Sequence, residues 1–165
     1  MTLTTRSGLV SIVCALTVVC GWSQVDGQTM ARGFPNVVDA LRTAPGCLGV
    51  ETGQTASGRR VIFAWFENKR TLVDWYHSDV HQRAMRRVFP DVPFDREPLP
   101  DLPESSGPIL AIVSVQFNET ASAIASIGIE LYGPLPGGVA VGGRFAPSAV
   151  KVPGLRELPL STGGR

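Results

Sequence analysis

The sequence predicts an α+β domain in which an antiparallel sheet carries two helices on one face. Two observations predict it. A short helical pattern is followed by two strand-like segments around a glycine turn, and a long amphipathic pattern is followed by further apolar strands. Strands and helices grouped in this way are typical of the α+β class. The 165 residues amount to one domain, and the 44% of hydrophobic residues can supply its core.

The first helix is expected over Phe34–Thr43, because Pro35 suits a first helical turn and the apolar stripe ends at the stop signal APG. Cys47–Thr55 and Val61–Phe66 are then expected as the two strands of a hairpin around the turn ASGRR. The second of these strands is apolar on both faces, which is typical of a central strand covered on both sides. Helices can cover one face, while the other requires a second sheet, such as that of another subunit.

A long helix is expected over Leu72–Pro90, with Asn68 as its N-cap and Pro90 as its end. Its apolar side chains recur every four residues and should face the core: Leu72, Tyr76, Val80, Ala84 and Val88. Residues 90–108 contain six prolines and are expected to form a connector without regular structure.

The second half of the chain should supply the remaining strands. Ile109–Phe117 is the clearest, Ile127–Tyr132 is another, and the turn GPLPGG can join the latter in a hairpin to Val139–Phe145. The last fifteen residues lack any period and are expected to be a disordered tail. A ferredoxin-like split βαβ pattern needs one more strand beside the first hairpin. Either Gln28–Gly33 precedes the first helix as that strand, or Ile109–Phe117 takes its place.

The N-terminus predicts a secretory signal peptide over residues 1–23, with Arg6 as its basic start and Leu9–Cys20 as its uncharged apolar core. That core is short for a membrane span, which needs about 20 residues. We therefore expect export to the periplasm or the extracellular space; a retained membrane anchor is the alternative. The mature chain would comprise an α+β domain over 28–133 and a hairpin extension with a disordered tail over 134–165.

The cysteine count and the charge exclude some classes of protein. Cleavage would remove Cys14 and Cys20 and leave Cys47 as the one cysteine of the mature chain, so no internal disulfide is expected. We expect Cys47 to be a buried structural thiol. The 15 basic and 14 acidic residues give no basic excess for binding nucleic acid. We therefore expect neither nucleic acid nor, beyond the signal segment, a membrane as a partner.

Residues 45–90 carry three motifs: PG with LGVE at the first hairpin strand, W-F-E at the end of the second, and W-x-x-S-D-x-H-Q in the long helix. On these motifs the chain resembles the antibiotic-biosynthesis-monooxygenase family, within the dimeric α/β-barrel superfamily. The resemblance implies a homodimer in which two ferredoxin-like subunits pack sheet against sheet. It also implies a cofactor-independent monooxygenase, because some members oxidise phenolic or quinol substrates without metal or flavin.

Four aromatic side chains are the candidate substrate-binding residues of such an enzyme: Phe63, Trp65, Phe66 and Trp75. We expect them to line a pocket between helix and sheet that holds a flat aromatic molecule. His81 is the candidate catalytic base, because an imidazole with an unperturbed pKa of about 6.5 suits proton abstraction near neutral pH. The simpler interpretation is that the tryptophans only pack. The alternative function is a non-catalytic module that binds a small ligand on the same scaffold.

His77 and His81 lie four residues apart on one helical face, a spacing that can bind zinc. The stretch HSDVH lacks the glutamate that follows the first histidine of metalloprotease helices, and no third ligand is evident, so no metal site is expected. The same region is similar to the heme-degrading monooxygenases of the superfamily, with Trp65 and Trp75 at matching positions. The axial histidine of that pattern falls on Met85, so no cofactor is expected.

Overall fold

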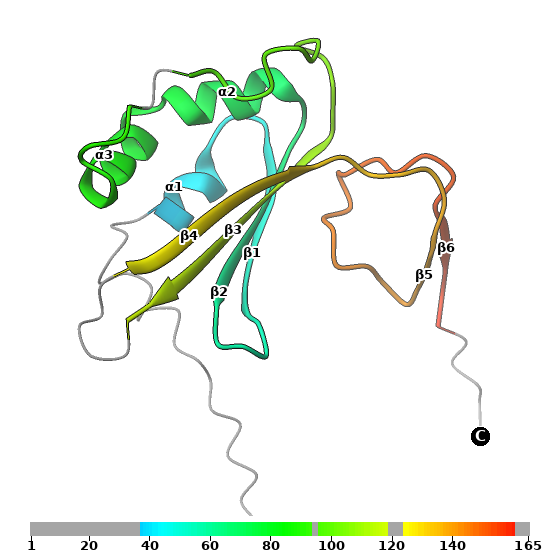
Figure 1. The fold of residues 1–165 in the computed structure, drawn as a ribbon. Coiled ribbons are helices and arrows are strands. Elements are labelled where there is room, and N and C mark those ends of the chain that lie inside the picture. Colours follow the sequence, from blue (N-terminus) through cyan, green and yellow to red (C-terminus); the bar gives the residue numbers. More distant parts are fainter. Residues whose placement is uncertain (1–36, 94–95, 119–123, 161–165) are drawn as a thin grey trace, which may run out of the picture.

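The computed structural model describes residues 37–93, 96–118 and 124–160. The described residues form an α+β fold with a four-stranded antiparallel sheet, as predicted (Figure 1). The strands lie in the sheet in their order along the chain: β1 (Cys47–Gln54), β2 (Arg60–Phe66), β3 (Ile109–Phe117) and β4 (Ile124–Tyr132). The expected signal peptide and the candidate strand Gln28–Gly33 lie outside the described residues.

Strand β2 is central, because it pairs with β1 on one side and with β3 on the other, both in antiparallel register. Most of its side chains are buried on both faces of the sheet, which confirms the prediction made from its two apolar faces. Strand β3 lies directly beside β2. The sequence offered two segments for this position, Gln28–Gly33 and Ile109–Phe117. In the described part of the chain, Ile109–Phe117 occupies it.

Three helices among the described residues cover one face of the sheet, here called the inner face (Figure 1). They are α1 (Val37–Thr43), α2 (Lys69–His77) and α3 (Asp79–Val88). Helices and sheet enclose an apolar core of Val37, Leu41, Ile62, Ala64, Phe66, Leu72, Ala84, Ile109 and Ala111. Each large aliphatic or aromatic side chain in this core contributes about 1.5–3 kcal/mol through burial.

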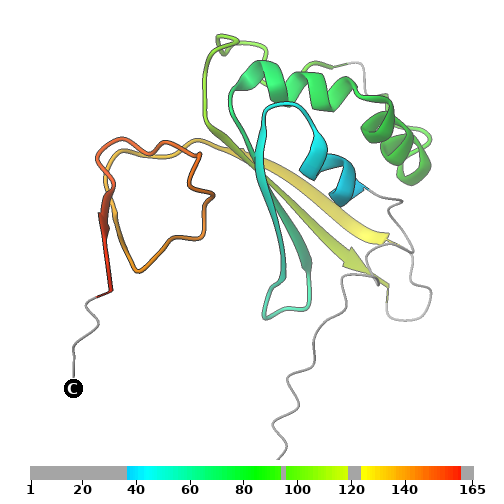
Figure 2. The same ribbon diagram turned by 180° about the vertical axis from the view of Figure 1, so that it is seen from behind.

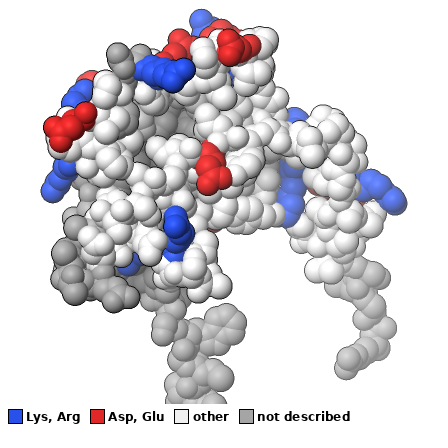
Figure 3. Space-filling model, in the orientation of Figure 1, with Lys and Arg blue, Asp and Glu red and all other residues white. Residues whose placement is uncertain are grey.

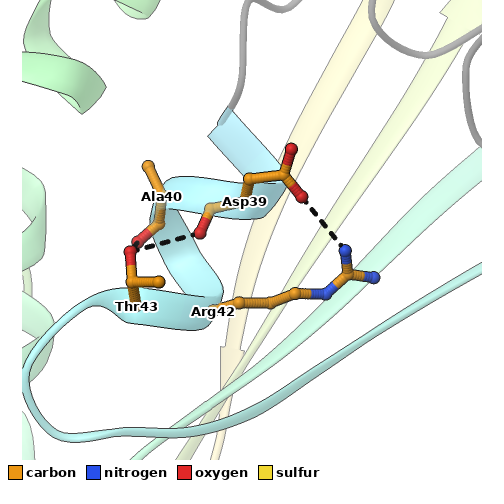
Figure 4. A network of polar contacts seen from close by, with 4 residues as sticks. All are labelled: Asp39, Ala40, Arg42 and Thr43. Carbon is orange, nitrogen blue, oxygen red and sulfur yellow. Dashed lines mark hydrogen bonds and ion pairs between the residues drawn. The ribbon is translucent and has the colours of Figure 1, made fainter.

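Helix α1 has only seven residues and depends on this core, since so short a helix is unstable alone. Val37 and Leu41 are its buried side chains and belong to the expected apolar stripe. Local contacts stabilise its exposed side (Figure 4). Arg42 Nη1 lies 3.2 Å from Asp39 Oδ1, and the Thr43 hydroxyl lies within hydrogen-bond distance of the Asp39 and Ala40 carbonyls.

The long helix expected up to Pro90 is broken at Ser78. Ser78 has extended backbone dihedrals, so α2 ends there, and its hydroxyl accepts a 3.3 Å hydrogen bond from the His81 amide as the N-cap of α3. Asn68 caps α2, as predicted. The break changes which side chains face the core. Leu72 and Ala84 are buried as expected, Met85 is buried as well, and Tyr76, Val80 and Val88 are only half-buried.

Residues 134–160, here called the C-terminal arm, differ from prediction. Strand β5 (Val139–Val141) does not form a hairpin with β4; it pairs in parallel with β6 (Arg156–Leu158). Strand β6 falls inside the stretch expected to be a disordered tail, of which residues 161–165 lie outside the described residues. The arm is held by Arg144, which donates to the Val150 and Ser148 carbonyls and pairs with Glu157 at 3.2 Å. Such a non-local arrangement leaves no periodic signal in the sequence.

The C-terminal arm lies on the opposite side of the sheet from the helices (Figure 2). The face on that side, here called the outer face, carries Phe63 and Trp65, and the Phe145 ring of the arm meets both edge-on, at 5.0 and 5.2 Å between centroids. Pro147 packs against Gly49 so closely that there is no room for a Cβ there. Part of the outer face is therefore covered by the chain itself, where a second subunit was expected.

Candidate functional site

A cavity of about 290 Å³ lies between the helices and the inner face of the sheet. Its wall is almost entirely apolar and includes side chains from all three helices and from β2, β3 and β4. Ala64, Ala84 and Ala111 contribute small side chains to this wall, so helices and sheet do not close on each other completely. An apolar cavity with few polar groups is the usual form of a small-molecule site.

Strand β4 forms the wall of the cavity at the edge of the sheet. Ile127, Ile129 and Leu131 line it from alternate positions along the strand, as side chains on one face must. Ile129 is 48% exposed although it is apolar and lies on the face covered by the helices. The cavity is therefore open to solvent beside this residue.

His81 and Tyr76 are the titratable side chains in the wall of the cavity, and His81 is the predicted base. Its Nδ1 lies 2.8 Å from the Tyr76 carbonyl oxygen, and because a carbonyl only accepts, Nδ1 carries the hydrogen and Nε2 carries the lone pair. The ring also packs against Trp75, at 5.9 Å between centroids, and Tyr76, at 5.2 Å. The break at Ser78 produces this geometry, since the first turn of α3 returns His81 to the end of α2.

Burial lowers the pKa of His81, and the positive charge of nearby His77 lowers it further, while the hydrogen bond to the Tyr76 carbonyl acts in the opposite direction. The imidazole is therefore neutral at pH 7. A neutral imidazole with a fixed tautomer can accept a proton at Nε2, or accept a hydrogen bond from a ligand hydroxyl.

The structure separates the four predicted substrate-binding aromatics. Phe66 and Trp75 line the cavity with His81, whereas Phe63 and Trp65 lie on the outer face against the arm. The expected pocket shared by all four is therefore not formed. Side chains alternate along a strand, so Phe66 cannot share a face with its neighbour Trp65.

Several cavity-lining residues were not expected to form a site. The sequence predicts β4 as a strand but gives it no part in a site. The alternation in IGIELY nevertheless places Ile127, Ile129 and Leu131 on one face. Met85 lines the cavity from α3, whereas the sequence indicates it only as the position of the axial ligand in the heme pattern. Pro98 belongs to the proline-rich connector, which gave no signal for a contact with the cavity.

Residues 96–108 of the connector, here called the strap, run back over the start of α2. Pro98 lines the cavity and Leu99 packs against the core. The carbonyls of Ser106 and Glu104 accept hydrogen bonds from the Lys69 and Arg70 amides, which have no partner within the first turn of a helix. The strap therefore completes both the cavity wall and the N-terminus of α2.

Lys69 holds the strap with its side chain and is only 3% exposed. Its Nζ lies 3.0 Å from Glu97 Oε1 and 3.3 Å from Glu104 Oε1, and it donates to the Leu102 carbonyl at 3.0 Å. The hydrogen bond to Glu97 raises the pKa of Lys69, which keeps the ammonium charged. A buried lysine with three partners on one segment fixes that segment to the helix.

We expect Lys69→Met to loosen the strap while leaving the helix–sheet core in place, because methionine keeps the apolar stem and removes the three contacts. Hydrogen–deuterium exchange should become faster in peptides that cover residues 96–108. Arg87→Met is the control, since Arg87 is an exposed basic residue on α3. Unchanged exchange in the strap of Lys69→Met would contradict this role for the lysine.

The described residues contain no group of three or more His, Cys, Asp or Glu side chains placed to hold a metal ion. His77 is exposed and contacts the Tyr76 ring, whereas His81 turns toward the cavity. Cys47 is free and only half-buried, where a buried thiol was predicted, and its partial burial raises the pKa of the thiol. In the part of the chain that the structure describes, no helix is long and apolar enough to cross a membrane.

Comparison with known proteins gives no match: neither a family model nor a curated protein matches the sequence, and no solved structure matches the fold. The resemblance to the antibiotic-biosynthesis-monooxygenase family therefore rests on the motifs within residues 45–90.

Proposed function

We propose that this chain is an exported, homodimeric protein of the antibiotic-biosynthesis-monooxygenase type that oxidises a small phenolic or quinol-type molecule without a cofactor. The observation that supports the proposal is the position of the His81 imidazole in the wall of an apolar cavity, where its Nδ1 lies 2.8 Å from the Tyr76 carbonyl oxygen. The substrate would place its rings against Trp75 and Phe66 and direct its hydroxyl to His81 Nε2. The four-stranded antiparallel sheet with helices on one face is compatible with a ferredoxin-like subunit.

The proposed reaction starts with transfer of the phenolic proton to His81 Nε2, which leaves an electron-rich phenolate in an apolar surrounding. The phenolate supplies electrons to O2, and a new C–O bond forms at the ring carbon opposite the hydroxyl. That carbon loses its hydrogen, so the phenol becomes a quinone. One oxygen atom of O2 is in the quinone and the other leaves as water, with the hydrogens of the hydroxyl and of the ring carbon.

A ligand-binding module without catalysis is the second candidate, and the composition of the cavity wall favours it. Beside His81, Tyr76 and the indole N–H of Trp75, the described lining residues offer only apolar side chains. Catalysis also requires a donor that stabilises the developing negative charge. A wall of this composition suits the binding of an apolar ligand through one hydroxyl.

The experiment that tests the proposal uses 1-naphthol as a flat probe with one hydroxyl, and follows both binding and O2 uptake in metal-free buffer. We expect saturable binding and formation of 1,4-naphthoquinone, with one molecule of O2 consumed for each quinone formed. Binding of 1-methoxynaphthalene, which cannot donate to His81, should be weaker by about 0.5–1.5 kcal/mol, the contribution of one hydrogen bond.

The result separates the two candidates. Binding of 1-naphthol without O2 uptake would reject the enzyme and support the binding module. Absence of binding by either naphthalene would reject both candidates for this cavity. Equal affinity for the two probes would remove His81 from the recognition of the ligand.

Export can be tested independently of the ligand. The positive Arg6 and the uncharged run Leu9–Cys20 motivate the proposal. N-terminal sequencing of the secreted protein should give a first residue between Trp22 and Gln28. A full-length chain that remains in the cytosol would contradict it.

A further inference from the structure

The outer face of the sheet has an apolar centre and acidic edges. Glu51, Phe63, Ile112 and Glu130 are opposite one another across the four strands, so their side chains form one row on this face. Both carboxylates are exposed. Arg60 is the one basic residue of these strands, and alternation places it on the inner face. The outer face therefore presents negative charge around apolar side chains.

The C-terminal arm has the opposite character. Six of the ten large hydrophobic side chains exposed among the described residues lie on it, although it is only a small part of the chain: Leu135, Val139, Val141, Phe145, Leu158 and Leu160. The contacts of Arg144 hold the arm backbone in one conformation, so these exposed side chains have fixed positions relative to one another. An ordered apolar surface of this kind marks an interaction site.

The arm also carries unpaired positive charge. Lys151 and Arg156 are exposed, and neither side chain has an ion-pair partner among the described residues. Figure 3 shows that much of the arm stands clear of the rest of the molecule, with an open recess between the two. The arm thus carries two cations, and the outer face carries two carboxylates. The arm of the same chain covers this face around Trp65, Phe63 and Gly49.

We propose that the C-terminal arm of one chain lies on the outer face of a second copy of this chain. The exposed valines and leucines of the arm meet the part of the partner's outer face that the partner's own Phe145 and Pro147 do not cover, and the arm cations lie near its acidic edges. Because both features are present on each copy, the contact is made twice around a two-fold axis. The inference rests on the homodimer of the proposed function and identifies the arm as the element that holds the partner.

Two charge-reversed forms of the mature chain test the contact between copies. The face-reversed form carries Glu51→Lys and Glu130→Lys, and the arm-reversed form carries Lys151→Glu and Arg156→Glu. Each form alone places like charges at both contacts of its homodimer, so its dimerisation should weaken by about tenfold at low salt. A mixture of the two forms places opposite charges at both contacts, and heterodimers should exceed homodimers by a similar factor.

Sedimentation velocity with one form fluorescently labelled measures the homodimers, the heterodimers and the wild-type chain. Excess heterodimer that disappears at high salt supports the arm contact. A wild-type monomer at high concentration would overturn both the homodimer and the arm contact. A wild-type dimer whose charge-reversed forms still form homodimers normally, or whose mixture gives no excess heterodimer, would overturn the arm contact alone. Binding of 1-naphthol does not depend on either outcome.

Discussion

Replacing Phe66 by alanine should lower the free energy of unfolding by about 3–5 kcal/mol, the usual loss for a fully buried phenylalanine. The side chain is 1% exposed, lies on the central strand, and belongs to the core between helices and sheet. Alanine would remove its apolar contacts and enlarge the adjoining cavity, which the packed sheet cannot collapse to fill. Because domains of this size have a total stability of only about 5–15 kcal/mol, the effect should be large. Urea unfolding followed by circular dichroism measures it.

Val92→Ala is the matched control, because Val92 is a large apolar residue that is exposed on the connector after α3. Its free energy of unfolding should differ from that of the wild-type chain by less than about 0.5 kcal/mol. Similar losses for the two variants would mean that Phe66 is not the core residue described above.

Replacing His81 by asparagine should reduce turnover of 1-naphthol by about 10²- to 10⁴-fold, the usual contribution of a general base. The asparagine amide can still donate to the Tyr76 carbonyl, so the local backbone should be kept while the basic Nε2 is lost. Affinity for the ligand should fall far less than turnover. Steady-state O2 uptake and a binding titration on the same variant separate the two effects.

The pH dependence follows from the lowered pKa of His81. The base is active when neutral, so turnover should rise with pH and level off, with its midpoint below the ordinary histidine value of 6.5. Stability should change in the same direction. The folded protein binds this proton less readily than the unfolded chain does. The free energy of unfolding should therefore decrease as the pH falls below 6.5 toward the lowered pKa of His81.

His77→Asn is the control for the histidine, because His77 is exposed and lies one turn earlier in the chain. It should retain turnover, and the midpoint of the pH profile should move slightly upward once the nearby positive charge is removed. Normal activity in His81→Asn would reject the histidine as the base.

Much of the fold could be predicted because its signals are local. Strands β2 and β3 are uninterrupted apolar runs, and the turn ASGRR separates the first hairpin strands clearly. The break at Ser78 could not be seen in the same way, because the four-residue repeat of apolar positions continues across it. Ser78 followed by Asp79 is a helix-start signal, and it was hidden inside a longer periodic pattern.

The site was predictable only in part. Trp75 and His81 could be chosen as candidates from their residue types, but they lie on α2 and α3, and the unpredicted break at Ser78 brings their rings together. The cavity depends on alanines from three distant elements and on the edge strand β4, which meet only in the folded chain. The pairing of β5 with β6 is likewise non-local and is held by contacts of Arg144 that no sequence period announces.

The most direct test of the cavity is a spectrum of the tryptophan indole N–H signals in the uniformly ¹⁵N-labelled protein during titration with 1-naphthol. Trp75 lines the cavity, while Trp65 lies on the outer face under the Phe145 ring. Trp75→Phe and Trp65→Phe assign the signals of these two among the three tryptophans of the chain. We expect the Trp75 signal to move progressively to saturation while the Trp65 signal stays in place. A shift of Trp65 with Trp75 unchanged, or no shift of either, would contradict a ligand site between the helices and the sheet.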